Sequence, residues 1–279
     1  MKAERPILRY HGGKWMLAEW IISHFPPHRV YIEPFGGAAS VLLQKRRSYS
    51  ECYNDLSGEL VNLFRVMRDR GPELQAQLIL TPFARREYAL SFEVCEDELE
   101  QARRTIIRSF MGFGSNALCR AVKSGFRFNA NISGTTPAHD WANLPGSQDA
   151  IIERLQGVVL ECRPGGEIIE ALDSRETLIY ADPPYVHSTR MSQNGSHHGY
   201  DFEMSDAEHK TLAQQLRGAD GMVILSGYHC DLYDELYGDW TRVEKAALAD
   251  GARKRTEVLW LNPAAVAGRS QGHLYEATA

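Results

Sequence analysis

The chain has 279 residues, of which 43% are hydrophobic and 24% are charged, a composition typical of a soluble globular protein. Its length allows one large domain, or a catalytic domain that carries a smaller insert. The net charge of −5 gives the chain no overall basic character for binding nucleic acid, although a local cleft can differ in charge from the rest of the surface.

The sequence predicts neither a membrane protein nor a metalloprotein. No apolar run approaches the roughly 18 residues that a membrane span needs, and the N-terminal segment lacks the apolar core of a signal peptide. The cysteines are too widely spaced for a zinc or redox CxxC motif, which indicates reduced thiols in a cytoplasmic protein. They are Cys52, Cys95, Cys119, Cys162 and Cys230.

The first elements predicted along the chain alternate between strand and helix. Residues 29–33 (RVYIE) predict a short strand, which continues through PFGGAAS into an apolar run that predicts a helix as far as Leu43. Residues 50–55 (SECYND) predict a second strand. Ser57 is then expected to cap an amphipathic helix, which Gly71 and Pro72 are expected to end.

The middle of the chain has a different character and predicts an inserted domain. A charged helix is expected over residues 96–110, followed by a stretch rich in glycine, asparagine, serine and aromatic residues that has no helical period. We place the insert at residues 58–149, within a larger domain made of residues 1–57 and 150–279.

The alternation of strands and helices resumes near Ala150. Apolar runs predict strands at residues 158–162, 177–181, 222–226 and 257–261, and Ser205 with Glu208 predicts the capping box of a helix between them. Strands that alternate with helices in this way predict an α/β fold with a doubly wound, mainly parallel sheet.

Two glycine-containing motifs suggest ligand contact. In EPFGGAAS (33–40) a strand runs into small residues, where backbone N–H groups can approach a ligand, and Asp55 at the end of the next strand could accept hydrogen bonds from a ribose. A tight turn with a surface aspartate explains the same pattern, and the motif does not distinguish NAD from S-adenosylmethionine. The motif RYHGGK (9–14) is weaker and is too short for a Walker A loop.

The most specific signal is Asp182-Pro183-Pro184-Tyr185, which directly follows the predicted strand TLIYA. Two prolines fix the backbone at the carboxyl end of a parallel strand, where ligands bind. A carboxylate and a proline carbonyl at that point can both accept hydrogen bonds from one amino group, and Tyr185 offers an aromatic face to a base. The alternative is a rigid turn with an incidental acid and aromatic residue.

Taken together, HGGK, EPFGGAASV, the acid in YNDL and DPPY resemble the Dam-like, alpha-group, D12 class of DNA adenine-amino methyltransferases. The order of these motifs, with an insert between the glycine motif and DPPY, is that of the alpha group. NALCR (116–120) and GFRFN (125–129) are similar to the recognition hairpin of this family, and VILSGYH and RTEVLWLN to its later motifs.

The resemblance implies a Rossmann-like methyltransferase fold whose domain of residues 1–57 and 150–279 binds S-adenosylmethionine, with residues 58–149 as a mostly helical target-recognition domain containing a β-hairpin. The implied catalytic residues are Asp182, Pro183, Pro184 and Tyr185. The implied cofactor-binding residues are Tyr10, Lys14, Pro34, Phe35, Gly36, Gly37, Asp55 and Asp182. One departure concerns the cofactor's adenine ring, because Arg163-Pro164-Gly165 follows residues 158–162 where many relatives have an acid.

The expected partner is double-stranded DNA. Asn116, Arg120 and Arg127 of the insert, with Ser188 and Arg190 of the polar segment 186–200, are the candidate DNA-binding residues. Clustered insert cations are expected to add DNA contacts, although such clusters are usually solvated faces. They are Arg103, Arg104, Arg108 and Lys123. The pair His197-His198 is interpreted as polar surface.

The predicted activity is transfer of a methyl group from S-adenosylmethionine to the exocyclic amino group of a flipped adenine in duplex DNA, without a metal, by a monomer or weak dimer. Cytosine-amino methylation of DNA, or adenine methylation of RNA, would use the same DPPY chemistry. A non-catalytic DNA-binding protein is a further alternative, which the intact motif disfavours. The biological role, in restriction-modification, phage protection or regulation of a bacterial host, stays open.

Overall fold

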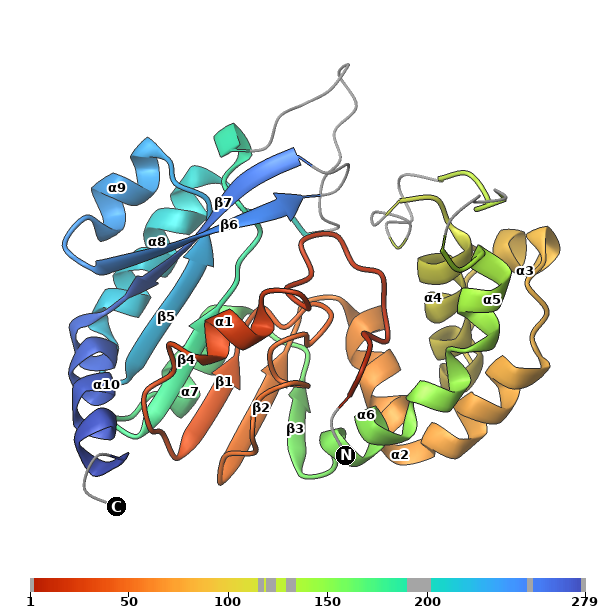
Figure 1. Ribbon diagram of the computed structural model, residues 1–279, viewed down its shortest axis with the longest axis horizontal. Coiled ribbons are helices and arrows are strands. Elements are labelled where there is room, and N and C mark those ends of the chain that lie inside the picture. Colours follow the sequence, from red (N-terminus) through yellow and green to blue (C-terminus); the bar gives the residue numbers. More distant parts are fainter. Residues whose placement is uncertain are drawn as a thin grey trace.

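The computed structural model describes residues 3–114, 118, 124–128, 134–189, 202–249 and 253–276. In this part of the chain one seven-stranded sheet has the order β3-β2-β1-β4-β5-β7-β6 (Figure 1). The first five strands pair in parallel, and β7 runs antiparallel to both β5 and β6. The strands are β1 (Val30–Glu33), β2 (Ser50–Asn54), β3 (Val158–Glu161), β4 (Thr177–Ala181), β5 (Met222–Gly227), β6 (Thr241–Ala249) and β7 (Arg253–Leu261).

Both faces of the sheet are covered, which confirms the predicted α/β class. Alternate strand residues enter two separate cores, so that Tyr31 of β1 packs on one face and Ile32 on the other. Helices α1 (Ala18–Ile22), α2 (Gly58–Leu80) and α10 (Pro263–Glu276) contribute to the first core. Helices α7 (Gly165–Leu172), α8 (Asp206–Gly218) and α9 (Asp231–Tyr237) cover the second face. The capping box of Ser205 and Glu208 begins α8 as predicted.

The segment between β2 and β3 is helical and lies beside the β3 edge of the sheet (Figure 1). It contains α2, α3 (Arg85–Leu90), α4 (Glu98–Met111), α5 (Pro137–Ala142), the 3₁₀ turn η2 (Pro145–Ser147) and α6 (Asp149–Leu155). At the end of α4 a short antiparallel pairing forms, in which Phe113 N donates to Gly125 O at 2.8 Å and Gly112 bridges Phe126. Buried residues of α2 and α4 belong to the first core of the sheet, so this segment packs continuously onto it.

Two local expectations were wrong. Gly71 and Pro72 do not end α2, which kinks at Arg70 and continues to Leu80, because a proline is tolerated in the first turn of the second helical piece. The apolar run after β1 forms consecutive turns instead of a helix. Ala39 adopts a φ of 53° there, which interrupts a right-handed helix.

The sequence interpretation also missed one strand. Residues 241–249 form β6, which pairs with β7 in an antiparallel hairpin, and β7 begins four residues before the predicted strand of residues 257–261. Many of these positions are charged and partly exposed, so neither helical nor strand periodicity is evident in the sequence.

Candidate active site

A cavity of about 430 Å³ opens at the carboxyl ends of β1, β2 and β4. Its wall includes the segment Tyr10–Lys14, the glycine turn after β1, Asp55 after β2, the start of α7 and Asp182 after β4. Seven of the eight residues expected to bind the cofactor line it. They are Tyr10, Lys14, Phe35, Gly36, Gly37, Asp55 and Asp182. Pro34 does not line the cavity, but its carbonyl accepts a hydrogen bond from Asn54 Nδ2 at 2.8 Å.

The glycine turn is shaped by tyrosines that leave no room for side chains. A Cβ atom at Gly36 would lie 2.2 Å from the Tyr53 ring, and one at Gly37 would lie 2.9 Å from the Tyr10 ring. Gly37 also has a φ of 48°, in the left-handed region that glycine adopts at little cost. The Tyr53 hydroxyl donates to the Gly37 carbonyl at 2.7 Å. These contacts hold the backbone of the turn against the cavity.

Asp55 organises this turn through both carboxylate oxygens. Gly37 N donates to Oδ2 and Ser57 N donates to Oδ1, each at 2.8 Å. One backbone N–H that the sequence interpretation directed toward a ligand is therefore occupied by Asp55. Asp55 also lines the cavity, and a carboxylate oxygen can accept more than one hydrogen bond.

Asp182 is held at the cavity wall from two sides. Lys14 Nζ lies 3.0 Å from Oδ2, and the Ser226 hydroxyl donates to Oδ1 at 2.5 Å. Lys14 is buried and also donates to the Gly12 carbonyl at 2.9 Å. The ammonium group of the HGGK motif therefore contacts the carboxylate of the DPPY motif. Pro183 is buried and Pro184 is half-buried. This geometry fixes the plane of the carboxylate before any substrate binds.

Tyr185 does not present an open aromatic face. Its side chain is only 4% exposed, and it is not part of the cavity wall. The hydroxyl donates to Glu257 Oε2 at 2.9 Å, Lys14 Nζ lies 4.7 Å from the ring centroid, and the Tyr228 ring packs edge-to-face at 4.6 Å. Stacking of a base on this ring remains a prediction. It requires that side chains now packed against the ring, such as Lys14 and Tyr228, move away.

A buried acid at the end of β1 was not predicted as a site residue. Glu33 lines the cavity, is 2% exposed, and accepts a hydrogen bond from the Tyr31 hydroxyl at 2.6 Å. Burial raises the pKa of its carboxyl to about 7, against the lowering effects of Tyr31 and the nearby cations. The feature of the sequence that could have identified Glu33 as a site residue is its position as the first residue of EPFGG.

Ser226 and Glu257 were also missed, because their roles depend on strand order. Ser226 follows Leu225, which pairs with Ala181 between β5 and β4, and so lies opposite Asp182. A sequence pattern gives no such neighbour relation. Glu257 reaches the site only because β7 inserts antiparallel beside β5.

The segment Arg163-Pro164-Gly165, where the sequence put the contact to the cofactor's adenine ring in doubt, follows β3. Arg163 forms an exposed ion pair with Glu167 at 2.8 Å. Pro164 and Gly165 line the cavity instead, and a Cβ at Gly165 would lie 2.8 Å from the Phe35 ring. Glu167 and Gln215 line the cavity as well, so its wall beside Pro164 carries polar side chains in addition to apolar and backbone atoms.

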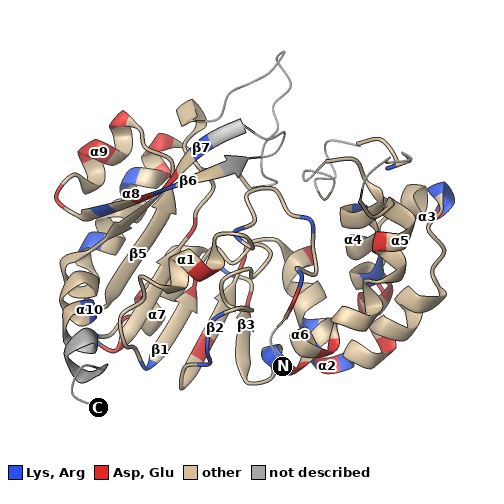
Figure 2. Ribbon diagram, viewed as in Figure 1, with Lys and Arg blue, Asp and Glu red and all other residues tan. Residues whose placement is uncertain are grey.

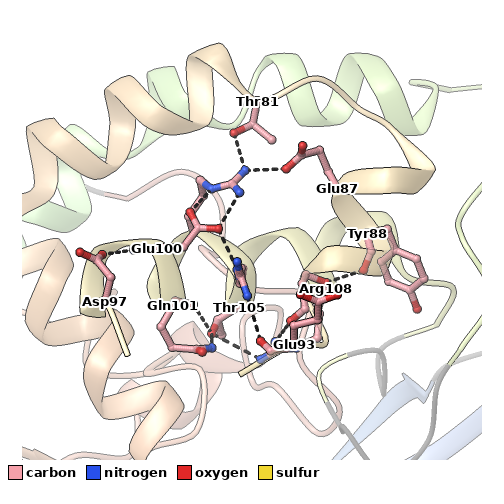
Figure 3. Close-up of polar contacts among 12 residues, drawn as sticks. Thr81, Glu87, Tyr88, Glu93, Asp97, Glu100, Gln101, Thr105 and Arg108 are labelled. Atoms are coloured by element: carbon pink, nitrogen blue, oxygen red, sulfur yellow. Dashed lines mark hydrogen bonds and ion pairs between the residues drawn. The ribbon is translucent and has the colours of Figure 1, made fainter. Parts of the chain in front are cut away.

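The arginines of α4 are engaged in ion pairs within the helical segment. Arg103 pairs with Glu87 and Glu100, and Arg104 pairs with the same Glu100. Figure 3 labels these two acids, Glu87 and Glu100, in this network of polar contacts. Arg108 is fully buried, bonded to Glu59 and to the Ser91 carbonyl. Basic and acidic positions are intermixed over these helices (Figure 2). These ion pairs stabilise the helical segment. The expected DNA contact is wrong for the buried Arg108, and for Arg103 and Arg104 it stays a prediction.

The structure describes only some of the remaining DNA-binding candidates. Asn116, Arg120, Lys123, Arg190 and the pair His197-His198 lie outside the described residues. Ser188 is exposed in the 3₁₀ turn η3 (His187–Thr189), shortly after the DPPY motif. Arg127 lies 3.4 Å from Asp140, to which Arg5 also bonds at 2.8 Å.

Within the described part of the chain, no group of three or more His, Cys, Asp or Glu side chains could hold a metal ion. No helix described there is long and apolar enough to cross a membrane. Cys52, Cys95, Cys162 and Cys230 are free cysteines.

Comparison with known proteins bears on the same residues. Residues 10–250 match the family described as D12 class N6 adenine-specific DNA methyltransferase. The chain is 28% identical over 241 residues to the DNA adenine methylase of Vibrio cholerae serotype O1, covering 82% of this chain and 83% of that protein. It is 27% identical over 247 residues to the enzyme of that name from Salmonella typhimurium, covering 85% of each chain. It is 26% identical over 245 residues to the DNA adenine methylase of Escherichia coli strain K12, again covering 85% of each. The family match spans the glycine motif, the helical segment and the DPPY motif, and the chain belongs to the D12 class of N6 adenine-specific DNA methyltransferases.

Proposed function

We propose that this protein transfers a methyl group from S-adenosylmethionine to the exocyclic amino group of adenine in double-stranded DNA. The observation that carries the proposal is the geometry of Asp182, whose two carboxylate oxygens are fixed by Lys14 and Ser226 at the wall of one cavity. A carboxylate held in this way orients an amino group without a covalent intermediate. The names of the relatives support adenine as the base and DNA as the polymer.

The cavity fits S-adenosylmethionine in size and chemistry. About 430 Å³ is within the usual range for small-molecule sites. Asp55 can accept hydrogen bonds from ribose hydroxyls, and Phe35 with Leu56 offers apolar surface to the adenine ring. The Ser40 hydroxyl also lines the cavity, is buried, and has no hydrogen-bond partner among the described residues, as expected where a ligand would supply one.

The bound cofactor supplies an electrophilic methyl group on a sulfonium. The chain's own residues act on the amine. The Asp182 carboxylate and the Pro183 carbonyl accept its two protons as hydrogen bonds, which directs the nitrogen lone pair toward the methyl carbon. Lys14 and Ser226 prevent the carboxylate from rotating away. After transfer the nitrogen must lose one proton. Asp182, the one carboxylate of the DPPY motif, can accept it.

Adenine must leave the base stack to reach this site, at a cost of a few kcal/mol. Stacking on the Tyr185 ring would return about 1–3 kcal/mol, if base entry displaces what now covers the ring. We assign base or phosphate contacts to Asn116, Arg120, Arg127, Ser188 and Arg190. A monomer or weak dimer is sufficient for this scheme, because every proposed catalytic group belongs to one chain.

The test uses purified protein, methyl-labelled S-adenosylmethionine and unmethylated plasmid DNA, followed by digestion to nucleosides. We expect label on adenine, and mapping the modified positions would give the recognition sequence. Label on cytosine would keep the mechanism and replace the substrate base. Absence of label on DNA despite cofactor binding would refute the proposal and direct the assay to RNA.

A matched variant separates chemistry from binding. Asp182→Ala should abolish transfer while DNA affinity survives. A variant that retains even a tenth of wild-type turnover would contradict the assigned role of this carboxylate.

A further inference from the structure

A second carboxylate lies behind the DPPY motif. Glu257 of β7 is 8% exposed and accepts a hydrogen bond from the Tyr185 hydroxyl at 2.9 Å. The β5–β7 pairing includes Gly227 opposite Val258, so the next step along both strands brings Glu257 opposite Tyr228. Because β7 runs antiparallel beside β5, an acid from the C-terminal part of the chain lies within hydrogen-bonding distance of the Tyr185 hydroxyl.

We propose that Glu257 is a positioning residue for methyl transfer, which fixes Tyr185 and, through Lys14, the Asp182 carboxylate. The proposal rests on the function proposed above. Glu257 does not line the cavity, so it acts through Tyr185 on Lys14, which does line it, and does not itself contact the reacting atoms.

The first link is the orientation of Tyr185. Its ring has Lys14 over one side and Tyr228 packed against it, and its hydroxyl is directed at Glu257. Rotation of the ring would leave a buried carboxylate without this donor, which costs more than the net gain from an ordinary hydrogen bond. The Glu257 carboxylate therefore holds the Tyr185 side chain at its hydroxyl end.

The second link is Lys14. Its ammonium lies between Asp182 Oδ2, at 3.0 Å, and the Tyr185 ring, whose centroid is 4.7 Å away. A ring held in place gives the ammonium a fixed aromatic surface beside its carboxylate partner. Burial raises the pKa of the Glu257 carboxyl, while Lys14 and the hydroxyls of Tyr185 and Tyr228 oppose that effect. Lys14 is therefore in contact with Asp182 and also acts electrostatically on Glu257.

A structural role alone predicts something different from a positioning role. If Glu257 only stabilised the fold, its replacement would lower the folded fraction but leave the rate of each folded, ligand-bound enzyme unchanged. If it positions Tyr185 and Lys14, the rate of the folded enzyme falls, and a replacement that keeps an acceptor oxygen restores it.

The experiment measures single-turnover methylation of plasmid DNA by wild type, Glu257→Met and Glu257→Gln, with saturating S-adenosylmethionine and rates normalised to cofactor-binding sites. Methionine fills a similar volume without an acceptor, and glutamine keeps one. We expect Glu257→Met to be slower by about 10- to 100-fold, the equivalent of one hydrogen bond to a charged group. Glu257→Gln should stay within about 3-fold of wild type in the same assay. The matched control is Glu244→Met, an exposed acid on the neighbouring strand β6.

Tyr185→Phe removes the same hydrogen bond from the other side, so it decides the question even if Glu257→Met does not fold. It should slow transfer by a similar factor, and the double variant should be no slower than the slower single variant. A wild-type rate for either single variant, or effects that multiply in the double variant, would overturn the proposal. Failure of the wild-type enzyme to methylate DNA would instead overturn the function on which it rests.

Discussion

Replacing Glu33 with glutamine should stabilise the protein in a pH-dependent manner. The side chain is 2% exposed at the end of β1, and its Oε1 accepts the Tyr31 hydroxyl at 2.6 Å. Glutamine resembles the protonated acid in shape and keeps an acceptor for Tyr31. The substitution therefore removes the ionisation of this site and little else.

The sign follows from the raised pKa. The carboxyl has a pKa of about 7 in the folded protein and an ordinary value of 4.5, so the folded state holds the proton more tightly than the unfolded state. Wild-type stability consequently falls as the pH rises from about 4.5 to 7 and then levels off. At about 1.4 kcal/mol per pH unit the full penalty is about 3 kcal/mol. Most of it, about 2 to 3 kcal/mol, develops between pH 5 and pH 8.

The measurement is the free energy of unfolding in urea for wild type and Glu33→Gln, without cofactor, at intervals from pH 5 to pH 9. The advantage of the variant should grow across this range by the amount given above and then become constant. Parallel curves would show that the Glu33 carboxyl ionises normally, and the argument from burial would then be wrong. Glu244→Gln, which replaces an exposed acid on β6, is the matched control for the loss of one carboxylate.

Three further substitutions test the structural roles assigned above. Arg108→Met should lower the free energy of unfolding by about 2–4 kcal/mol, because Glu59 loses a buried partner, and the folded variant should bind DNA like wild type. Gly36→Ala should reduce stability by at least 1–3 kcal/mol by overpacking against Tyr53, as measured by urea unfolding. Asp55→Ala should weaken S-adenosylmethionine binding about 10- to 100-fold in calorimetry, since it removes both a ligand acceptor and the contact to the glycine turn.

The central strands β4 and β5 were predictable because they are buried throughout and consist largely of apolar residues. Thr177–Ala181 is buried throughout, and its predicted bounds are those observed. A motif at the end of such a strand must lie at the edge where ligands bind. For this reason DPPY and the glycine motif could be brought to one cavity without knowledge of the strand order.

The rest depended on partners that are distant in sequence. Spacing placed Arg103, Arg104 and Arg108 on one helix, but it gave no information on Glu59 or Glu87, which neutralise two of them from α2 and α3. The buried state of Tyr185 likewise depends on a strand that runs antiparallel to its neighbour. Periodicity predicts which face of a helix or strand is buried, but it does not predict which acidic side chain will form an ion pair with a given arginine.

The internal use of these arginines changes what is expected of DNA binding. A chain of net charge −5 that employs its α4 cations in ion pairs has fewer charges with which to displace counterions from phosphates. Each phosphate neutralised contributes about −0.9 to the slope of log K against log salt concentration. Arg104→Gln should therefore leave this slope unchanged while lowering stability, whereas a DNA-contacting arginine would reduce its magnitude by about 0.9. A reduction of that size for Arg104→Gln, measured by fluorescence anisotropy between 50 and 200 mM salt, would mean that its pairing with Glu100 opens when DNA binds.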